Sequence, residues 1–185
     1  MDKNELRKHY TALRSALGPT QIDSLSIAIS NRLLQLPLWQ GSYYHIFLPI
    51  PSKNEIDTSH ILTILFGKDK NVVIPKVVGN TLENYLLTDQ TKLKTSSWGV
   101  PEPMDGLSVP EKLIDVVFIP LLAYDEQGNR VGYGKGFYDG LLAKCKPDTL
   151  KVGLSLFGPE KKIGDVRKED IPLDYCVTPE QVYRF

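Results

Sequence analysis

Residues 115–120, DVVFIP, form a short apolar run that ends in proline. The run lacks the polar alternation of a strand with one face in water, so it is typical of a strand buried on both faces of a parallel sheet. Residues 71–75, NVVIP, show the same pattern. A sheet with two buried faces needs helices on each of them, and the two runs therefore predict an α/β protein.

Helical and extended segments alternate along most of the chain. We expect helices at 2–17, 20–36, 61–66 and 137–145, and strands at 43–48, 71–75, 82–87, 115–120, 151–156 and 175–178. No linker or internal repeat divides the sequence, so residues 1–185 are predicted to form one domain. Its expected fold is a three-layer α/β/α arrangement with a mainly parallel, Rossmann-like sheet.

The first two helices have recognisable start signals. Asp2 and Glu5 have the spacing of a capping box, and Thr20 is the expected N-cap of the second helix. The apolar face of the first helix is predicted to contain Leu6, Tyr10, Leu13 and Leu17. Gly18 and Pro19 are expected to end it.

The composition excludes several classes of protein. The 22 basic and 22 acidic residues cancel, so no general field attracts nucleic acid or a membrane surface. The charged N-terminus does not resemble a signal peptide, and no apolar run approaches the ~18–20 residues of a membrane-spanning helix. Cys145 and Cys176 are too few for a disulfide framework, and the three histidines show no metal-ligand spacing. We expect a cytoplasmic protein with reduced thiols.

The segment GNRVGYGKGFYDGLL, residues 128–142, is the clearest candidate for a ligand site. It lies between a buried strand and a predicted helix, where α/β proteins bind ligands. Glycines let a ligand approach the backbone, and free N–H groups there can hold an anion. Arg130 and Lys135 add directed donors for phosphate oxygens. The spacing fits neither a Walker A loop nor the GxGxxG dinucleotide motif, and a lone GxG would be an ordinary turn. The density of glycine and the two cations favour a polyphosphate site.

Asp139 falls in the first turn of the helix that follows this loop. A carboxylate beside phosphates is repelled unless a cation lies between them, and Mg²⁺ commonly bridges carboxylates to substrate phosphates. A carboxylate at this position can equally cap the helix or interact with its dipole. Both interpretations of Asp139 stay open at the level of this residue.

The loop resembles the signature of the 5-formyltetrahydrofolate cyclo-ligase family, in which G-x-R-[LV]-G-x-G-x-G-[YF]-Y-D follows a buried strand that ends in proline. The resemblance extends over nearly the whole chain. Its other parts are Lys3 with Arg7, IFLP at 46–49, EID at 55–57, IPK at 74–76, SWGVPEP at 97–103 and EDIPLDYCVTPE at 169–180.

The family resemblance implies an ATP- and Mg²⁺-dependent ring closure. In that reaction 5-formyltetrahydrofolate and ATP give 5,10-methenyltetrahydrofolate, ADP and phosphate. The γ-phosphoryl group activates the formyl oxygen, and N10 then attacks the formyl carbon. Because phosphoryl transfer depends mainly on positioning and charge neutralisation, the lack of a Ser-His-Asp or Cys-His set is no obstacle.

The resemblance also implies roles for individual residues. ATP would contact Lys3, Arg7, Arg130, Val131, Gly132, Tyr133, Gly134, Lys135, Gly136, Phe137 and Tyr138, with Lys135 and Arg130 as the catalytic residues. Asp139 would hold Mg²⁺ together with Asp170, and Asp174 is an alternative to Asp170. Read without the family, Lys3 and Arg7 would be a solvated helix face.

The same resemblance places the folate. Its expected contacts are Leu48, Glu55, Trp98, Tyr133, Gly134, Lys135, Gly136 and Phe137. Glu55 would accept hydrogen bonds from pterin N–H groups, and Trp98 would stack on the folate. Without the family, Glu55 could be a charge at a helix entry and Trp98 a core residue.

Two other functions remain compatible with the sequence pattern. A sugar-phosphate isomerase or a CoA-transferase-like enzyme could use a similar sheet and glycine-rich anion loop, because fold does not fix function. A non-catalytic nucleotide-binding protein would bind ATP and leave 5-formyltetrahydrofolate unchanged. In line with the family, we expect a monomer that binds neither nucleic acid nor membranes.

Overall fold

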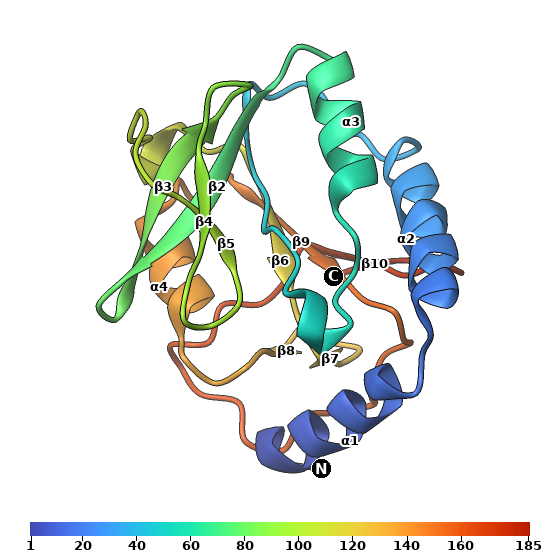
Figure 1. The fold of residues 1–185 in the computed structure, drawn as a ribbon. Helices are drawn as coiled ribbons and strands as arrows, with labels where there is room; N and C mark the ends of the chain where they lie inside the picture. Colours follow the sequence, from blue (N-terminus) through green and yellow to red (C-terminus); the bar gives the residue numbers. More distant parts are fainter.

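A seven-stranded sheet runs through the middle of the molecule in the computed structural model, which describes all residues from 1 to 185 (Figure 1). In sheet order the strands are β11 (Val182–Arg184), β10 (Tyr175–Val177), β9 (Leu150–Leu154), β6 (Val116–Pro120), β1 (Tyr43–His45), β2 (Asn71–Val78) and β3 (Thr81–Leu87). The strands from β10 to β2 are parallel, and β11 and β3 at the edges are antiparallel to their neighbours. The predicted mainly parallel sheet is confirmed.

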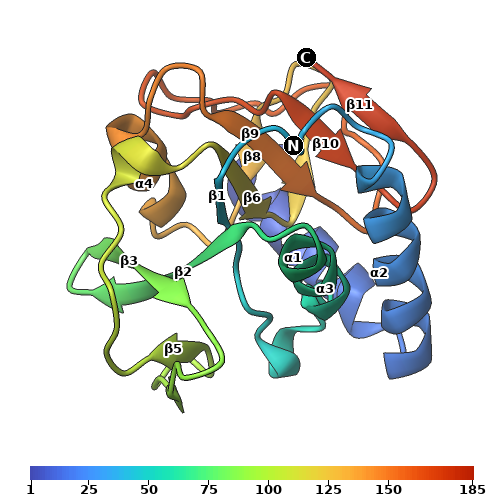
Figure 2. The same cartoon turned by 90° about the horizontal axis from the view of Figure 1, so that it is seen from above.

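The side chains of β6 show why the sheet needs two helical layers. Val116 and Phe118 pack into the same apolar cluster as residues of α2 (Pro19–Leu33) and α3 (Ser59–Gly67). Val117 and Ile119 pack on the opposite face, in a cluster with residues of α4 (Phe137–Lys144). Figure 2 shows α4 on one side of the sheet and α2 with α3 on the other. The alternating contacts of one apolar strand thus produce the expected three layers.

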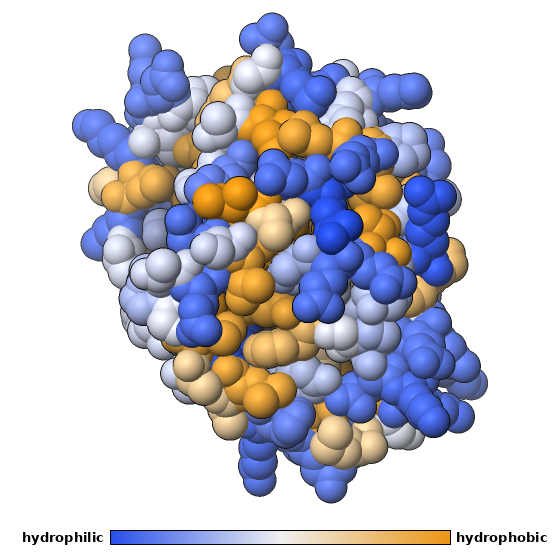
Figure 3. Space-filling model, turned by 90° about the vertical axis from the view of Figure 1, so that its right-hand side faces the viewer, coloured by the Kyte–Doolittle hydropathy of each residue, from blue (hydrophilic) through white to orange (hydrophobic).

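The outer surface over α2 and α3 is mixed in character. Figure 3 shows hydrophilic and hydrophobic residues interspersed on this side of the molecule. Ile27, Leu34 and Phe66 are the large apolar side chains of these two helices, or next to them, that remain exposed. None of the helices is both long and apolar enough to cross a membrane.

Helix α1 (Lys3–Ser15) lies outside these layers, against the hairpin of β7 (Ala123–Tyr124) and β8 (Arg130–Val131) (Figure 1). Asp2 and Glu5 form the predicted capping box. The predicted apolar face is partly wrong, because Leu13 is exposed and Arg14 is buried beside Leu6 and Tyr10. The buried line therefore follows the i, i+4, i+8 spacing and ends in a charged residue.

Several predicted boundaries differ from the structure. The N-cap of α2 is Gly18 and not Thr20, because Pro19 suits the first helical position and the Gln21 side chain binds the Gly18 N–H. Strand β1 ends at His45 instead of residue 48, where the chain leaves the sheet. Strand β2 continues through Pro75 to Val78, and this proline is tolerated because β1 has already ended beside it.

The structure also contains short elements that the sequence pattern did not predict. They are β11, the hairpins β4 (Leu93–Thr95) with β5 (Pro101–Pro103) and β7 with β8, and the 3-10 turns η1 (Pro51–Lys53) and η2 (Glu111–Leu113). The β7–β8 hairpin separates β6 from the glycine loop, which the sequence pattern placed directly after the strand. Strands of two or three residues are too short to show a periodicity.

Candidate active site

A cleft of about 810 Å³ opens at the carboxyl ends of β1 and β6. The chain continues from β1 through α3 to β2 on one side, whereas β6 pairs with β1 on the other side. This change of direction is where open α/β sheets bind ligands. The cleft volume lies within the roughly 300–1,000 Å³ that is usual for a small-molecule site.

Almost all residues predicted for the site line this one cleft. They are Lys3, Arg7, Leu48, Glu55, Trp98, Arg130, Gly132, Tyr133, Gly134, Lys135, Gly136, Phe137, Tyr138, Asp139 and Asp170. Val131 does not line it: its side chain is buried behind the wall with Leu6 and Tyr10. Asp174 also lies elsewhere, where its carboxylate accepts a hydrogen bond from Lys151 N at 2.8 Å. Of the two alternatives for a second metal ligand, only Asp170 lies in the cleft.

Two glycines of the loop have backbone conformations that other residues rarely adopt. Gly134 has φ 93°, and Gly136, which is the N-cap of α4, has φ 72°. A Cβ atom on Gly134 would lie 3.2 Å from Arg7 Cζ. Glycine is thus required here both by the left-handed turn and by the close approach of α1.

The cations of α1 point into the cleft and contact its far wall. Arg7 Nε donates to the carbonyl oxygen of Gly132 at 2.8 Å. Lys3 Nζ donates to the Asp170 carboxylate, and Lys3 N donates to Asp165 Oδ1 at 2.7 Å. Lys3 and Arg7 are therefore part of the cleft and not of a solvated helix face.

Each of the two candidate metal ligands keeps one carboxylate oxygen free of protein donors. Asp139 Oδ1 accepts from Arg130 Nη2 at 2.6 Å and from Ile171 N at 3.0 Å. Asp170 Oδ2 accepts from Lys3 and from Arg167 N at 2.8 Å. Burial raises the pKa of Asp170, but the Arg167 N–H and Lys3 outweigh it and hold the pKa below the ordinary value. The free oxygens are Asp139 Oδ2 and Asp170 Oδ1, and carboxylate oxygens are the donors that Mg²⁺ prefers.

Glu55 and Trp98 also line the cleft. Glu55 is only 7% exposed and accepts from Ile50 N at 2.9 Å. Burial raises its pKa, while the Ile50 N–H and then the charges of Arg14 and Lys53 oppose the rise. Trp98 is 52% exposed in the turn between β4 and β5, and Lys135 Nζ lies 4.9 Å from its ring centroid. Trp98 is thus not a core residue, and Glu55 is not an exposed charge at a helix entry.

Comparisons with known proteins show the family of this chain. Residues 1–179 match the sequence model of the 5-formyltetrahydrofolate cyclo-ligase family. The chain belongs to this family. A probable 5-formyltetrahydrofolate cyclo-ligase of Schizosaccharomyces pombe is 32% identical, with 100% of this chain and 98% of the relative covered. The 5-formyltetrahydrofolate cyclo-ligase of Escherichia coli K12 is 30% identical, with 93% of this chain and 97% of the relative covered.

A solved structure supports the same family assignment. The structure of Aquifex aeolicus 5,10-methenyltetrahydrofolate synthetase matches with a TM-score of 0.85 and 32% identity. The match covers 100% of this chain and 93% of the other. The likeness extends to the whole mixed α/β fold around the mainly parallel sheet.

This member of the cyclo-ligase family has two residues near the glycine loop that the sequence pattern did not single out: Lys53 lines the cleft, and Arg14 lines a small neighbouring cavity. Lys53 Nζ lies 4.2 Å from the ring centroid of Tyr133, and Arg14 donates to the Tyr133 hydroxyl. The only sequence signal for Arg14 is its position in line with Leu6 and Tyr10 on α1. For Lys53 no local pattern marks the contact, since Tyr133 is far away in the sequence.

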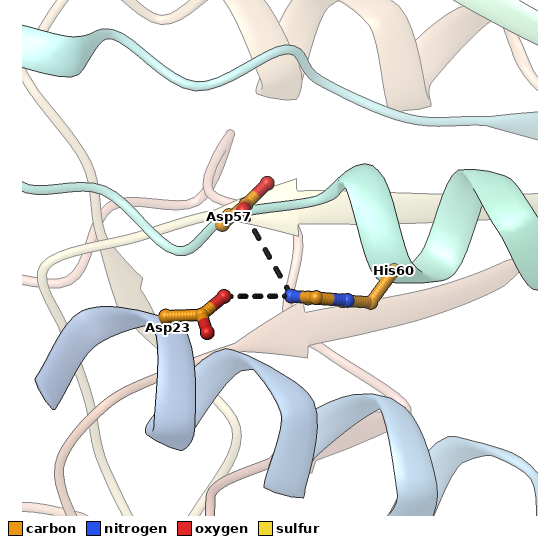
Figure 4. Close-up of side chains that lie close together, drawn as sticks. All are labelled: Asp23, Asp57 and His60. Carbon is orange, nitrogen blue, oxygen red and sulfur yellow. Dashed lines mark hydrogen bonds and ion pairs between the residues drawn. The ribbon is translucent and has the colours of Figure 1, made fainter. Parts of the chain in front are cut away.

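A separate cluster of Asp23, Asp57 and His60 lies outside the cleft (Figure 4). His60 Nε2 is 3.0 Å from Asp23 Oδ1 and 3.8 Å from Asp57 Oδ2, which ties α2 to the start of α3. Asp57 Oδ1 accepts from Ser59 N at 2.9 Å. The sequence pattern gave no sign of this grouping, because the fold brings Asp23 and His60 together. The contacts among these side chains account for the cluster as an exposed link between helices.

Proposed function

We propose that this chain closes 5-formyltetrahydrofolate to 5,10-methenyltetrahydrofolate at the expense of ATP, by phosphorylation of the formyl oxygen. The observation that carries the proposal is one cleft that contains both a cationic glycine loop and a buried carboxylate with an exposed tryptophan. The first set suits a triphosphate, and the second suits a planar heterocycle with N–H donors. Family membership favours this reaction over a sugar-phosphate isomerase or a non-catalytic nucleotide-binding protein.

The ATP end would be formed by α1 and the glycine loop. Lys3, Arg7 and Arg130 supply charged donors, and the backbone N–H groups of residues 132–136 supply neutral ones. Lys135 stands at the exposed tip of the loop and would neutralise charge on the transferred phosphoryl group. Arg130 would stabilise the same charge from the buried side of the loop.

Asp139 and Asp170 would hold Mg²⁺ through the carboxylate oxygens that no protein donor occupies. When bound, the ion would neutralise charge on the phosphates of ATP. Lys3 and Arg130 now pair with these carboxylates and would turn toward phosphate oxygens as ATP enters.

The chemistry conserves atoms and charge in three steps. The formyl oxygen attacks the γ-phosphorus, and the bond from that phosphorus to the oxygen of ADP breaks. N10 of the same folate attacks the formyl carbon of the resulting iminium phosphate and loses its proton. The carbon–oxygen bond to phosphate then breaks, which leaves the methenyl bridge between N5 and N10. Because both nucleophile and electrophile belong to one substrate, the protein contributes mainly orientation and exclusion of water.

The folate end would hold the pterin between the strand ends and the β4–β5 hairpin. Glu55 would accept pterin N–H groups, and Trp98 would stack on the folate. Leu48 and Phe137 would supply apolar contacts. Tyr133, Gly134, Lys135 and Gly136 would meet the formyl end of the substrate, where the two halves of the cleft join.

A spectrophotometric assay tests the proposed function. Protein is mixed with Mg-ATP and 5-formyltetrahydrofolate, and the methenyl chromophore is followed against a sample without ATP. We expect chromophore to form only with ATP, together with an equal amount of ADP. ADP formation without the chromophore would contradict the ligase function.

We also propose that the enzyme is a cytosolic monomer. One chain supplies both halves of the cleft, so catalysis needs no second copy. Both cysteines are free thiols, and Cys176 is buried, which suits a reducing compartment.

A further inference from the structure

Arg14 is a buried cation with no ion-pair partner. It lies in the last turn of α1 and is only 7% exposed, although arginine side chains usually lie at the protein surface. Its Nε atom is buried and has no hydrogen-bond partner. Burial of a guanidinium group costs free energy unless its N–H donors are hydrogen-bonded and its charge is compensated.

The Arg14 side chain contacts the glycine loop, and its backbone contacts the segment before Glu55. Its Nη2 atom donates to the hydroxyl of Tyr133, and its guanidinium carbon lies 5.8 Å from the Tyr133 ring centroid. Its carbonyl oxygen accepts from Asn54 Nδ2 at 2.9 Å. Asn54 immediately precedes Glu55, so the end of α1 is joined through the Arg14 backbone to the Glu55 segment and through the Arg14 side chain to the glycine loop.

Arg14 is also electrostatically coupled to Glu55. The two residues line the same small cavity of about 10 Å³, which shares Glu55 with the lining of the main cleft. The positive charge of Arg14 opposes the rise in the pKa of Glu55 that burial causes. An ionised Glu55 is acceptor-only, and this form is needed to receive N–H groups from a pterin.

Arg7 and Arg14 hold neighbouring residues of the glycine loop from one face of α1. They are seven residues apart, which is about two helical turns, so both side chains point the same way. Arg7 binds the Gly132 carbonyl, and Arg14 binds the Tyr133 side chain. Lys53 covers the ring of Tyr133 from η1, which restricts this side chain further.

We propose that Arg14 is a positioning residue for 5-formyltetrahydrofolate: it fixes the Tyr133 side chain and supports the charge of Glu55, so that the folate end of the cleft is held ready for the substrate. The inference rests on the proposed folate contacts of Tyr133 and Glu55. It assigns Arg14 no contact with the reacting atoms.

Four variants and one control test this role. The variants are Arg14→Met, Arg14→Lys, Tyr133→Phe and the Arg14→Met/Tyr133→Phe double variant, and the control is Arg32→Met. Arg32 of α2 is the matched control, because it also bonds a distant segment but does not line the cleft: its Nε donates to the Pro179 carbonyl oxygen at 2.8 Å. The measurements are the Kd of 5-formyltetrahydrofolate without ATP, from intrinsic protein fluorescence, and the KM of ATP. Circular dichroism checks the fold of each variant.

We expect Arg14→Met to weaken folate binding about tenfold, which corresponds to ~1.4 kcal/mol. The KM of ATP should change by less than about twofold, because Arg14 binds the Tyr133 hydroxyl, whereas the proposed phosphate donors are other side chains and backbone N–H groups. Arg14→Lys keeps the charge but loses the planar fork, so its folate affinity should lie between those of Arg14→Met and the unchanged protein. The Arg14→Met/Tyr133→Phe double variant should bind folate no more weakly than Arg14→Met, since both changes break one contact. Arg32→Met should bind folate and ATP normally.

Additive losses in the double variant, or equal effects on folate and ATP, would overturn the inference. If Arg14→Met does not fold, Tyr133→Phe decides, since only a hydroxyl is removed there. Normal folate affinity of Tyr133→Phe would then count against the role of Arg14. If the unchanged protein neither binds nor converts 5-formyltetrahydrofolate, the proposed function fails as well. If the unchanged protein turns the substrate over and the variants bind folate with normal affinity, only the role of Arg14 is refuted.

Discussion

The cations of the cleft already have partners within the chain. Lys3 contacts Asp170, Arg130 contacts Asp139, and Lys135 lies over the ring of Trp98. Phosphate oxygens compete with carboxylates for the same donors, so nucleotide binding exchanges these partners. The cation–π contact of Lys135 is the weakest of the three, at about 0.5–1 kcal/mol for an exposed pair. Lys135 is therefore the cation most free to follow a moving phosphoryl group.

Replacement of Lys135 by alanine tests this assignment. We expect Lys135→Ala to fold normally, because the side chain is exposed, and to lower kcat about 100- to 1,000-fold through lost charge stabilisation. Lys144→Ala, at the end of α4 and outside the cleft, is the matched control. Near-normal turnover of Lys135→Ala would remove this residue from the mechanism.

Asp139 connects the cation pairs to the proposed metal site. Asp139→Asn keeps the shape of the side chain but removes its charge, so the Mg²⁺ concentration for half-maximal activity should rise about tenfold or more. A magnesium titration of the steady-state rate measures this shift. Asp174→Asn serves as control, since Asp174 pairs with Lys151 outside the cleft. An unchanged titration curve for Asp139→Asn would favour the interpretation of Asp139 as a helix-terminal charge alone.

Among the elements of the fold, α1 and the glycine loop contact each other and form one part of the site. The position of the loop could be predicted from sequence, because glycines and cations within a few residues are a local signal. Arg14 could not, because its partner Tyr133 is 119 residues away. The end of β1 was also missed, since residues 46–48 are as apolar as a strand but follow its last residue, and Phe47 and Leu48 line the cleft. Local patterns thus predict elements, and the contacts between elements need the fold.

Gly134→Ala probes the contact between these two elements. The φ of 93° and the nearby Arg7 guanidinium make a methyl group unfavourable, at a cost of roughly 1–2 kcal/mol. We expect a lower melting temperature and a higher KM for ATP, because the loop must shift away from α1. Gly67→Ala at the end of α3 is the control, since it has open space and no left-handed φ. Equal effects of the two changes would refute the special role of Gly134.

At the scale of the whole molecule, the sheet determines both stability and the place of the cleft. The strands from β10 to β2 form the mainly parallel sheet that the apolar runs predicted, whereas the order of the strands was not predicted. The change of direction between β1 and β6 opens the cleft. Two polar residues are buried together in this sheet: His45 of β1 and Asn84 of β3, with His45 Nε2 3.0 Å from Asn84 Oδ1. The apolar pattern of the sequence could not have indicated this contact, because His45 and Asn84 lie on different strands and are far apart in the sequence.

His45 should make global stability depend on pH. Burial lowers its pKa to about 4, whereas an unfolded histidine titrates near 6.5. The unfolded state binds the proton first as pH falls, so the contribution of His45 is present above pH ~6.5 and lost toward pH ~4. The loss amounts to about 3 kcal/mol.

Denaturant unfolding at several pH values measures this contribution. His45→Gln should flatten the fall in stability between pH 6.5 and 4, because glutamine does not titrate. The exposed His9→Gln should leave the fall unchanged. The same slope in His45→Gln and the unchanged protein would contradict a buried neutral His45.

The most direct test of the account is a crystal structure with a non-hydrolysable ATP analogue and 5-formyltetrahydrofolate. We predict the triphosphate against residues 132–136 and the α1 cations, with its γ-phosphate directed at a formyl oxygen between Lys135 and Glu55. A nucleotide bound elsewhere, with the glycine loop empty, would contradict the account.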